Sequence, residues 1–275
     1  MIVIEAKGAK VPALGLGTYG MTGGPCVAAV RFALELGYRH VDTAQMYDNE
    51  TEVGQAIADS GIARAEIFLT TKVLPRNLGE GDLQRSADAS LGRLRTDYVD
   101  LLLVHWPNPS IPLVETLRAI TQVKAEGKAR HIGVSNFTVA LLSAAVEDHG
   151  ADLLANQVEY HPYLSQRPVL ASLNRYGMML TAYRPVAKGE TNDDPVLARI
   201  GKKYGKTGAQ VALRWLVEQD RVAAIPKAAS REHCRSNFEI FDFSLDAADT
   251  AAIAALTGDR RYLDPAWAPE WDPPD

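Results

Sequence analysis

Eight short apolar segments recur along the chain, and segments with helical periodicity lie between them. Apolar runs of about four to eight residues, bounded by turn residues, are typical of buried strands. Parallel strands need a crossover connection, usually a helix, so this alternation predicts an α/β fold with a parallel sheet. The expected strands span residues 13–17, 38–42, 66–72, 98–105, 129–135, 153–159, 178–183 and 222–226.

A closed (β/α)8 TIM barrel explains eight such units better than two separate domains do. The chain has 275 residues, which suits one barrel of this kind, and no Pro/Gly/Ser-rich linker divides it. We therefore expect residues 1–275 to form a single domain. Residues 1–11 are expected to form a short hairpin over one end of the barrel. Residues 245–256 are expected to form one more helix before an irregular end rich in Pro and Trp.

Composition narrows the possible partners and compartment. The net charge of -5 gives no electrostatic reason to expect nucleic acid or an anionic membrane as a partner. The two cysteines, Cys26 and Cys234, are too few for a disulfide framework and fit a reducing compartment. The first ten residues lack the apolar run of a signal peptide, and no apolar stretch is long enough for a membrane span. We therefore expect a cytoplasmic protein.

One glycine motif matches the consensus of a dinucleotide-binding fingerprint. Residues 15–20 read G-L-G-T-Y-G, and Asp42 lies 22 residues beyond the last glycine. The fingerprint works only where a strand precedes the loop and a helix opens at the third glycine. Here Gly20 is followed by MTGGP, so we expect no helix before Pro25, and Pro12 interrupts the preceding strand. The motif is therefore not read as a Rossmann fold.

Polar side chains stand at the ends of three consecutive expected strands. Asp42, Lys72 and His105 end the second, third and fourth strands, and Tyr47 follows in the loop after the second. Barrel enzymes place their active sites at the carboxyl ends of the strands. These four side chains are therefore expected to meet on one rim and to form a catalytic site.

The residue types indicate carbonyl chemistry. A tyrosine with its usual pKa of about 10 is a weak acid at neutral pH, and the ammonium of Lys72 beside Tyr47 would lower that pKa. A carboxylate at Asp42 would keep Lys72 charged in a dry site. His105 could orient a substrate carbonyl oxygen by hydrogen bonding. No side chain donates hydride, so a reductase built on these residues needs a cofactor.

Other interpretations of the same residues stay open. A lysine after a strand often only reaches solvent, a buried Asp–Lys pair can be structural, and a histidine ending a strand is often a satisfied core residue. Lys72 could instead form a Schiff base, as in barrel aldolases. A metal site is disfavoured because the first strand offers no H-x-H pair, and His40 is expected to be a packed residue.

Several longer motifs follow one another over nearly the whole chain, and they are GYRHVDTAQMYDNETEVGQAI, TTK, LLLVHWP, GVSNF, NQVEYHP and IPKAASREHCRSN. In this order they resemble the motifs of the aldo-keto reductase family. The ending APEWD and the YDNE context further resemble the bacterial 2,5-diketo-D-gluconate reductases of the shorter B type.

The resemblance implies a catalytic tetrad of Asp42, Tyr47, Lys72 and His105, acting on a carbonyl substrate with NADPH. It also implies a monomer. The residues that it assigns to the cofactor are Ser135, Asn136 and Gln157 for the nicotinamide carboxamide, Tyr183 for stacking on its ring, and Thr18, Arg184, Lys227, His233 and Asn237 along the rest of the cofactor. It assigns Tyr19 and Trp106 to the walls of the substrate pocket.

The late motif departs from the family pattern where the 2′-phosphate of NADPH is bound. Lys227 is kept, but the usual serine is Ala228 and the usual arginine is His233. A neutral imidazole does not replace a bidentate Arg–phosphate contact, so NADH or dual use is an alternative to NADPH. The arginines that could substitute are Arg184, Arg231 and Arg235.

A second departure is the short C-terminal tail, which in longer relatives folds over the substrate site. Its brevity predicts an open pocket and broad specificity for small aldehydes, ketones or keto sugars. The alternative from another class is a regulatory subunit that binds the cofactor and senses redox state with the same fold.

Overall fold

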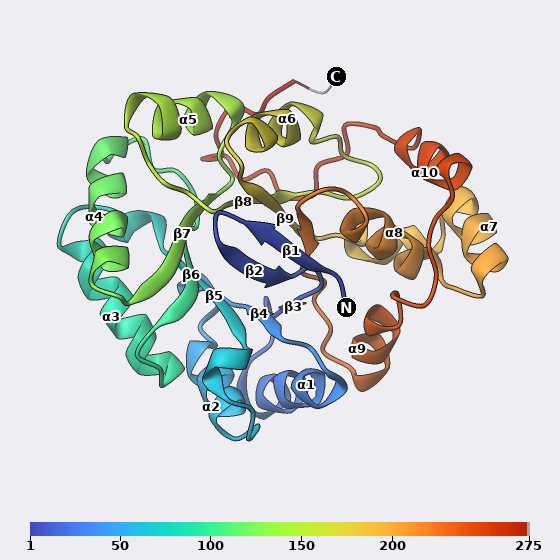
Figure 1. The fold of residues 1–275 in the computed structure, drawn as a ribbon, viewed down its shortest axis with the longest axis horizontal. Helices are drawn as coiled ribbons and strands as arrows, with labels where there is room; N and C mark the ends of the chain where they lie inside the picture. Colours follow the sequence, from blue (N-terminus) through green and yellow to red (C-terminus); the bar gives the residue numbers. More distant parts are fainter. Residues whose placement is uncertain (274–275) are drawn as a thin grey trace.

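In the computed structural model, which describes residues 1–273, eight parallel strands form one sheet in which each strand pairs with its neighbour in the sequence. All eight expected strands are confirmed, although most are shorter than expected. Figure 1 shows the helices arranged around this sheet. The strands are β3 (Leu16–Gly17), β4 (His40–Asp42), β5 (Phe68–Val73), β6 (Val99–Val104), β7 (Ala129–Ser135), β8 (Ala155–Glu159), β9 (Met179–Tyr183) and β10 (Val222–Ala224).

The sheet closes on itself between its first and last strands. The backbone N–H of Gly15 donates to the carbonyl of Ala224 over 2.9 Å, and that of Gly17 donates to the carbonyl of Pro226 over 3.1 Å. Ala224 in turn donates to the carbonyl of Ala13 over 2.8 Å. These bonds remove both edges of the sheet, and the expected (β/α)8 TIM barrel is confirmed.

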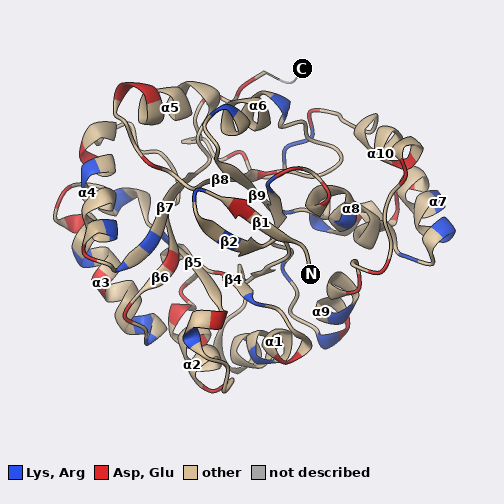
Figure 2. Cartoon of the chain, in the orientation of Figure 1, with Lys and Arg blue, Asp and Glu red and all other residues tan. Residues whose placement is uncertain are grey.

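The helices bury apolar residues, and Figure 2 shows charged residues of both signs distributed among the helices around the barrel. The helix expected over 245–256 is present as α10. No helix among residues 1–273 is long and apolar enough to cross a membrane. The helices are α1 (Gly23–Leu36), α2 (Glu50–Ala58), α3 (Asp82–Leu94), α4 (Leu113–Ala125), α5 (Val139–Ser143), α6 (Arg167–Arg175), α7 (Pro195–Tyr204), α8 (Gly208–Val217), α9 (Arg231–Phe238) and α10 (Ala247–Ala254).

The expected hairpin covers the amino-terminal end of the barrel. Strands β1 (Val3–Ala6) and β2 (Ala9–Pro12) pair antiparallel, and Lys7 and Gly8 both have positive φ, as a tight two-residue hairpin turn requires. Ile4 and Ala6 are buried beneath it. Figure 1 is viewed onto this hairpin. The carboxyl ends of the strands therefore lie at the opposite end of the barrel.

The expectation that no helix begins before Pro25 is wrong. Helix α1 begins at Gly23, after Thr22, so Pro25 occupies its third position. The first four N–H groups of a helix have no partner within the helix, so proline costs no hydrogen bond there. The carboxylate of Glu52 accepts a hydrogen bond from the N–H of Gly23 over 3.1 Å.

The glycines of the G-L-G-T-Y-G motif serve barrel packing instead of a phosphate loop. A Cβ on Gly15 would lie 2.8 Å from the ring of His40, and a Cβ on Gly17 would lie 2.6 Å from the backbone carbonyl of Ile225. Both glycines lie at the seam between β3 and β10. Together with the barrel topology, this close approach confirms that the motif does not form a Rossmann fold.

Gly17→Ala should destabilise the chain by about 1–3 kcal/mol, because backbone at the barrel seam has to move to admit the methyl group. Urea denaturation measures this free energy of unfolding. The control is Gly92→Ala within α3, where a Cβ meets nothing within 4 Å and helix propensity should improve stability by up to about 1 kcal/mol. A Gly17→Ala variant as stable as the wild type would contradict the seam contact.

Candidate active site

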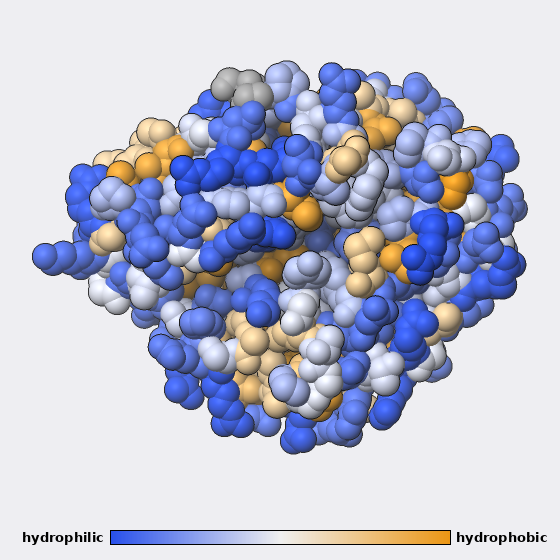
Figure 3. Space-filling view, turned by 180° about the vertical axis from the view of Figure 1, so that it is seen from behind, coloured by the Kyte–Doolittle hydropathy of each residue, from blue (hydrophilic) through white to orange (hydrophobic). Residues whose placement is uncertain are grey.

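A cavity of about 590 Å³ opens at the carboxyl end of the barrel. Figure 3 shows the face opposite the hairpin, which is hollowed near its centre with hydrophobic residues beside the hollow. Of the tetrad and the residues that the resemblance assigned to the cofactor and the substrate pocket, Lys72 alone lies outside the lining, because its side chain is fully buried beneath it. The others that line the cavity are Thr18, Tyr19, Asp42, Tyr47, His105, Trp106, Ser135, Asn136, Gln157, Tyr183, Arg184, Lys227, His233 and Asn237.

The ammonium of Lys72 joins Asp42 and Tyr47 at the bottom of this cavity. Its Nζ donates to Asp42 Oδ1 over 2.5 Å, to the backbone carbonyl of Thr43 over 2.8 Å and to the Tyr47 hydroxyl over 3.2 Å. Asp42 and Lys72 come from the neighbouring strands β4 and β5, and Tyr47 ends a 3-10 turn at Gln45–Tyr47 that follows β4. The three side chains meet because adjacent parallel strands end at the same rim.

Burial and charge oppose each other in this group. Burial lowers the pKa of Lys72, but Asp42 and Tyr47 outweigh it, so the net shift is upward and Lys72 stays an ammonium. Burial raises the pKa of Tyr47, and the nearby Lys72 only partly opposes this increase. The expectation of a lowered pKa for Tyr47 is therefore wrong, because desolvation of the phenolate exceeds the attraction of the ammonium.

His105 is a neutral imidazole beside Tyr47. The two rings meet edge to face with centroids 5.6 Å apart. Burial first, and then the charge of Lys72, lower the pKa of His105 well below its usual value. Its buried Nδ1 has no hydrogen-bond partner among the described residues. A bare acceptor nitrogen is better tolerated there than an unpaired N–H, so we infer that the proton is on Nε2.

His40 is a packed residue, as expected. Its Nδ1 lies 3.0 Å from the backbone carbonyl of Pro12, and its ring meets the ring of Phe68 edge to face. It does not line the cavity. Among residues 1–273, no three His, Cys, Asp or Glu side chains lie together as a metal site would require.

A chain of polar side chains connects the ends of β7, β8 and β9 to Asp42. Gln157 Nε2 donates to Asp42 Oδ2 over 2.7 Å, and the hydroxyl of Ser135 donates to the backbone carbonyl of Gln157 over 2.8 Å. The amide of Asn136 donates to the backbone carbonyl of His105 over 3.1 Å and accepts from the Tyr183 hydroxyl over 2.8 Å. These side chains are therefore fixed in place before any ligand binds.

The hydroxyl of Thr18 also forms a hydrogen bond within the protein. It donates to the backbone carbonyl of Asp42 over 3.0 Å, and the side chain is fully buried although it borders the cavity. Thr18 thus couples the end of β3 to the end of β4.

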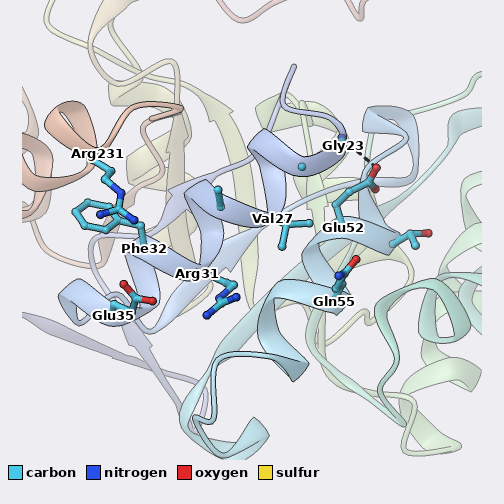
Figure 4. A pocket seen from close by; sticks show the side chains of 11 residues that line it. Gly23, Val27, Arg31, Phe32, Glu35, Glu52, Gln55 and Arg231 are labelled. Carbon is cyan, nitrogen blue, oxygen red and sulfur yellow. Dashed lines mark hydrogen bonds between the residues drawn. The ribbon is translucent and has the colours of Figure 1, made fainter.

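Basic side chains also line the cavity. They belong to Lys227, Arg184 and His233, and His233 lies in the first turn of α9, which begins after Ser230. The other two candidate arginines lie elsewhere. The guanidinium groups of Arg231 and Arg235 lie over the ring of Phe32, at 4.7 and 5.9 Å from its centroid. Figure 4 shows Arg231 with Phe32 in a separate groove of about 570 Å³ lined mainly by α1 and α2.

The C-terminal tail contributes a wall that the sequence analysis missed. Leu263, Pro265 and Trp267 line the cavity, and the ring of Trp267 meets that of Trp106 edge to face at 4.8 Å. The short tail thus still lines part of the cavity, and the expectation of an open pocket with broad specificity stays a prediction. The available signal in the sequence was the set of aromatic and proline residues near the end of the chain, because apolar residues in a tail usually pack on another surface.

The family model for the aldo/keto reductase family matches residues 13–257. The chain belongs to the aldo-keto reductase family. It is 44% identical over 266 residues to the methylglyoxal reductase DkgB of Escherichia coli O157:H7, a match that covers 95% of this chain and 99% of that protein.

Solved structures agree with this membership. A putative 2,5-diketo-D-gluconic acid reductase B superposes with a TM-score of 0.96 at 48% identity, covering 98% of this chain and 97% of that one. The Bombyx mori aldo-keto reductase, solved in complex with NADP, superposes with a TM-score of 0.89 at 32% identity, covering 96% and 95%. The expected resemblance is confirmed, and the chain is an oxidoreductase of a family that acts on carbonyl substrates with nicotinamide cofactors.

The lowered pKa of His105 predicts that stability falls as the solution is acidified. The unfolded chain takes up a proton at this histidine below about pH 6.5, whereas the folded chain resists it, so folding free energy is lost as pH falls from about 7 to 5. In His105→Gln this loss should shrink by about 2 kcal/mol, measured by urea unfolding at both pH values. The exposed His149→Gln serves as the control, and an equal loss in all three chains would contradict the prediction.

Proposed function

We propose that this protein is an NADPH-dependent reductase of small aldehydes, ketones or keto sugars in which Tyr47 is the general acid. The observation that carries the proposal is the contact of the Tyr47 hydroxyl with the fully buried ammonium of Lys72, in a cavity that Tyr47 and His105 both line. A nicotinamide cofactor supplies the hydride when bound, and the residues of the chain orient the carbonyl and provide the proton.

Tyr47 is suited to give up its proton only when negative charge develops on the substrate oxygen. Its raised pKa keeps the phenol protonated at neutral pH. As the carbonyl carbon receives hydride, its oxygen takes the phenolic proton, and the positive charge of Lys72 stabilises the phenolate left behind. Asp42 holds that lysine charged. His105, neutral and donating through Nε2, directs the carbonyl oxygen toward Tyr47.

The polar side chains at the ends of β7, β8 and β9 suit the nicotinamide. Ser135, Asn136 and Gln157 offer hydroxyl and amide groups in a fixed arrangement that matches a carboxamide. The ring of Tyr183 is held by its hydrogen bond to Asn136 and can stack on the nicotinamide ring. Thr18 then borders the same part of the cavity.

The basic side chains that line the cavity suit the phosphate groups of a nicotinamide cofactor. Lys227 and Arg184 supply positive charge, and Asn237 and His233 on α9 complete the cofactor site. Arg184 is the one arginine of the three candidates that lines the cavity, so it is the replacement that we assign to the missing arginine of the late motif. Because Ala228 and His233 weaken phosphate recognition, use of NADH as well is part of the proposal.

The substrate class follows from the cavity walls and the relatives. Tyr19, Trp106 and Trp267 form an aromatic surround for a small molecule. The similar proteins are named methylglyoxal reductase and 2,5-diketo-D-gluconic acid reductase, which supports a dicarbonyl or keto-sugar acid as the substrate here.

The environment of Lys72 disfavours a Schiff-base aldolase. A nucleophilic amine must be neutral and reachable, but this ammonium is fully buried, has a raised pKa and donates to three oxygens. The complete constellation of Asp42, Tyr47, Lys72 and His105 likewise favours an enzyme over a regulatory subunit that only binds cofactor.

We also propose a single-domain monomer of residues 1–275 that resides in the cytoplasm. One continuous barrel, two buried free thiols at Cys26 and Cys234, and a surface on which both signs of charge are mixed support this proposal. Light scattering coupled to size exclusion tests the oligomeric state.

The decisive experiment is the decay of absorbance at 340 nm with purified protein, comparing NADPH and NADH against methylglyoxal and a keto-sugar acid. Oxidation that requires both cofactor and carbonyl supports the reductase. Cofactor binding without turnover of any carbonyl would favour the regulatory subunit instead.

Tyr47→Phe should lower the rate of carbonyl reduction by about 10²–10⁴-fold, because the ring is kept and only the donated proton is lost. Cofactor affinity, measured by quenching of protein fluorescence, should stay near that of the wild type. Tyr19→Phe is the control, since the Tyr19 ring packs edge-on against Tyr47 with centroids 5.2 Å apart but has no part in proton transfer. Near-normal turnover in Tyr47→Phe would rule out its role as the acid.

His233→Arg should tighten NADPH relative to NADH by about tenfold, because an arginine can make charge-assisted bonds to the 2′-phosphate. The ratio of the two dissociation constants is the measurement. Arg231→Ala is the control and should leave the ratio unchanged, since Arg231 lies over Phe32 outside the cavity. An unchanged ratio in His233→Arg would place the phosphate away from residue 233.

A further inference from the structure

A buried carboxylate lies between the barrel and the C-terminal tail. Glu159 ends β8, and its side chain is fully buried. Its two oxygens accept hydrogen bonds from consecutive backbone N–H groups of the tail, over 2.7 Å from Tyr262 and 2.9 Å from Leu263. No lysine or arginine pairs with this carboxylate among the described residues. Its negative charge is therefore stabilised mainly by hydrogen bonds to the tail and to one histidine.

That histidine is His161, and its tautomer follows from its partners. The N–H of Tyr163 donates to His161 Nδ1 over 3.3 Å, so Nδ1 is an acceptor and the ring proton is on Nε2. Nε2 lies 3.1 Å from Glu159 Oε1 and donates to it. Burial raises the pKa of Glu159, but the hydrogen bonds from His161 and the tail outweigh burial, so the pKa is lowered overall and the group is ionised at neutral pH.

The segment that Glu159 holds leads directly into the substrate wall. Leu263 lines the cavity itself, and Pro265 and Trp267 follow within four residues. The loop beyond is braced internally, because Trp271 Nε1 donates to Asp264 Oδ1 over 2.9 Å and the guanidinium of Arg261 lies 3.8 Å from the centroid of the Trp271 ring. A braced loop moves as a unit, so its attachment at 262–263 sets the position of the whole wall.

The far end of the loop is attached more weakly. Asp272 accepts from the N–H of Val139, at the first turn of α5, with a shortest distance of 3.0 Å. This contact is part-buried, whereas Glu159 is fully buried. Hydrogen bonds to a buried charge are stronger than those exposed to water, so the Glu159 attachment dominates.

We propose that Glu159 is a positioning residue for the carbonyl substrate: its carboxylate fixes the C-terminal segment so that Leu263, Pro265 and Trp267 form the substrate wall. The kinetic part of this inference rests on the proposed reductase function. Glu159 does not line the cavity, so its effect on KM is exerted through the wall.

A carboxylate is required at residue 159 because two consecutive N–H groups of the tail each need an acceptor oxygen. Glutamine has the same shape but only one amide oxygen, so its NH₂ group would face an N–H of the tail, donor against donor. Glu159→Gln therefore breaks one attachment with little change in volume. Glu159→Asp keeps the charge beside His161 and shortens the reach to the tail, so it serves as a second variant that preserves the folded barrel.

The matched control is Asp100→Asn. Asp100 is a buried carboxylate on β6 that accepts from the N–H of Leu69 and pairs with Arg64 and Arg130, and it does not line the cavity. Its loss should lower stability without releasing the tail.

Tail attachment can be measured without turnover. Three of the four tryptophans, Trp106, Trp267 and Trp271, cluster at the tail, and the fourth is Trp215. Release of the tail should raise acrylamide quenching of fluorescence and the rate of trypsin cleavage at Arg260 and Arg261, each about threefold or more. Both should rise in Glu159→Gln and Glu159→Asp but not in Asp100→Asn.

For the reaction, KM for the carbonyl should rise about tenfold in Glu159→Gln, with kcat within about threefold of the wild type and unchanged cofactor affinity. Wild-type quenching and cleavage in both Glu159 variants would overturn the inference whatever the kinetics. A released tail with an unchanged KM would overturn the link to the substrate wall. Absence of turnover in the wild type would overturn the proposed function alone, and the two tail measurements would still decide the attachment.

Discussion

The fully buried ion pair between Lys72 and Asp42 is the interaction on which the site depends. Two charges removed from water are costly unless their remaining hydrogen-bonding groups are satisfied. Here the ammonium also donates to the Thr43 carbonyl and the Tyr47 hydroxyl, and the second carboxylate oxygen accepts from Gln157. The cost of burial is therefore offset by a network that fixes the side chains of Tyr47 and Gln157 together.

The assembly of this network depends on the order of the strands in the barrel. Asp42 and Lys72 can meet because β4 and β5 are adjacent and Lys72 lies two residues beyond Thr70, the partner of Asp42, and Gln157 reaches the pair from β8 across the barrel. A closed barrel brings residues from distant strands to one rim, whereas an open sheet would hold β4 and β8 apart. The meeting of these side chains therefore depends on closure of the barrel, and the close approach of the backbone at Gly17 allows that closure.

The sequence was sufficient to predict the barrel and the grouping of Asp42, Tyr47, Lys72 and His105, because both depend on local patterns. Apolar runs marked the strands, and the polar residues that end them mark the rim. The tail was not predictable in this way, since the position of Trp267 depends on contacts with Trp106 and on Glu159, which lies about a hundred positions earlier. The direction of the pKa shift of Tyr47 was also missed, because it depends on the extent of burial, which residue types alone do not give.

The hairpin at the amino-terminal end leaves the other end of the barrel for ligand entry. With Ile4 and Ala6 packed over that end, ligands reach the cavity from the carboxyl rim. The carboxamide-binding candidates Ser135 and Gln157 lie on the strands themselves, while the aromatic walls come from loops and the tail above them. A ligand that binds at the strand ends therefore passes these loops and the tail on its way into the cavity.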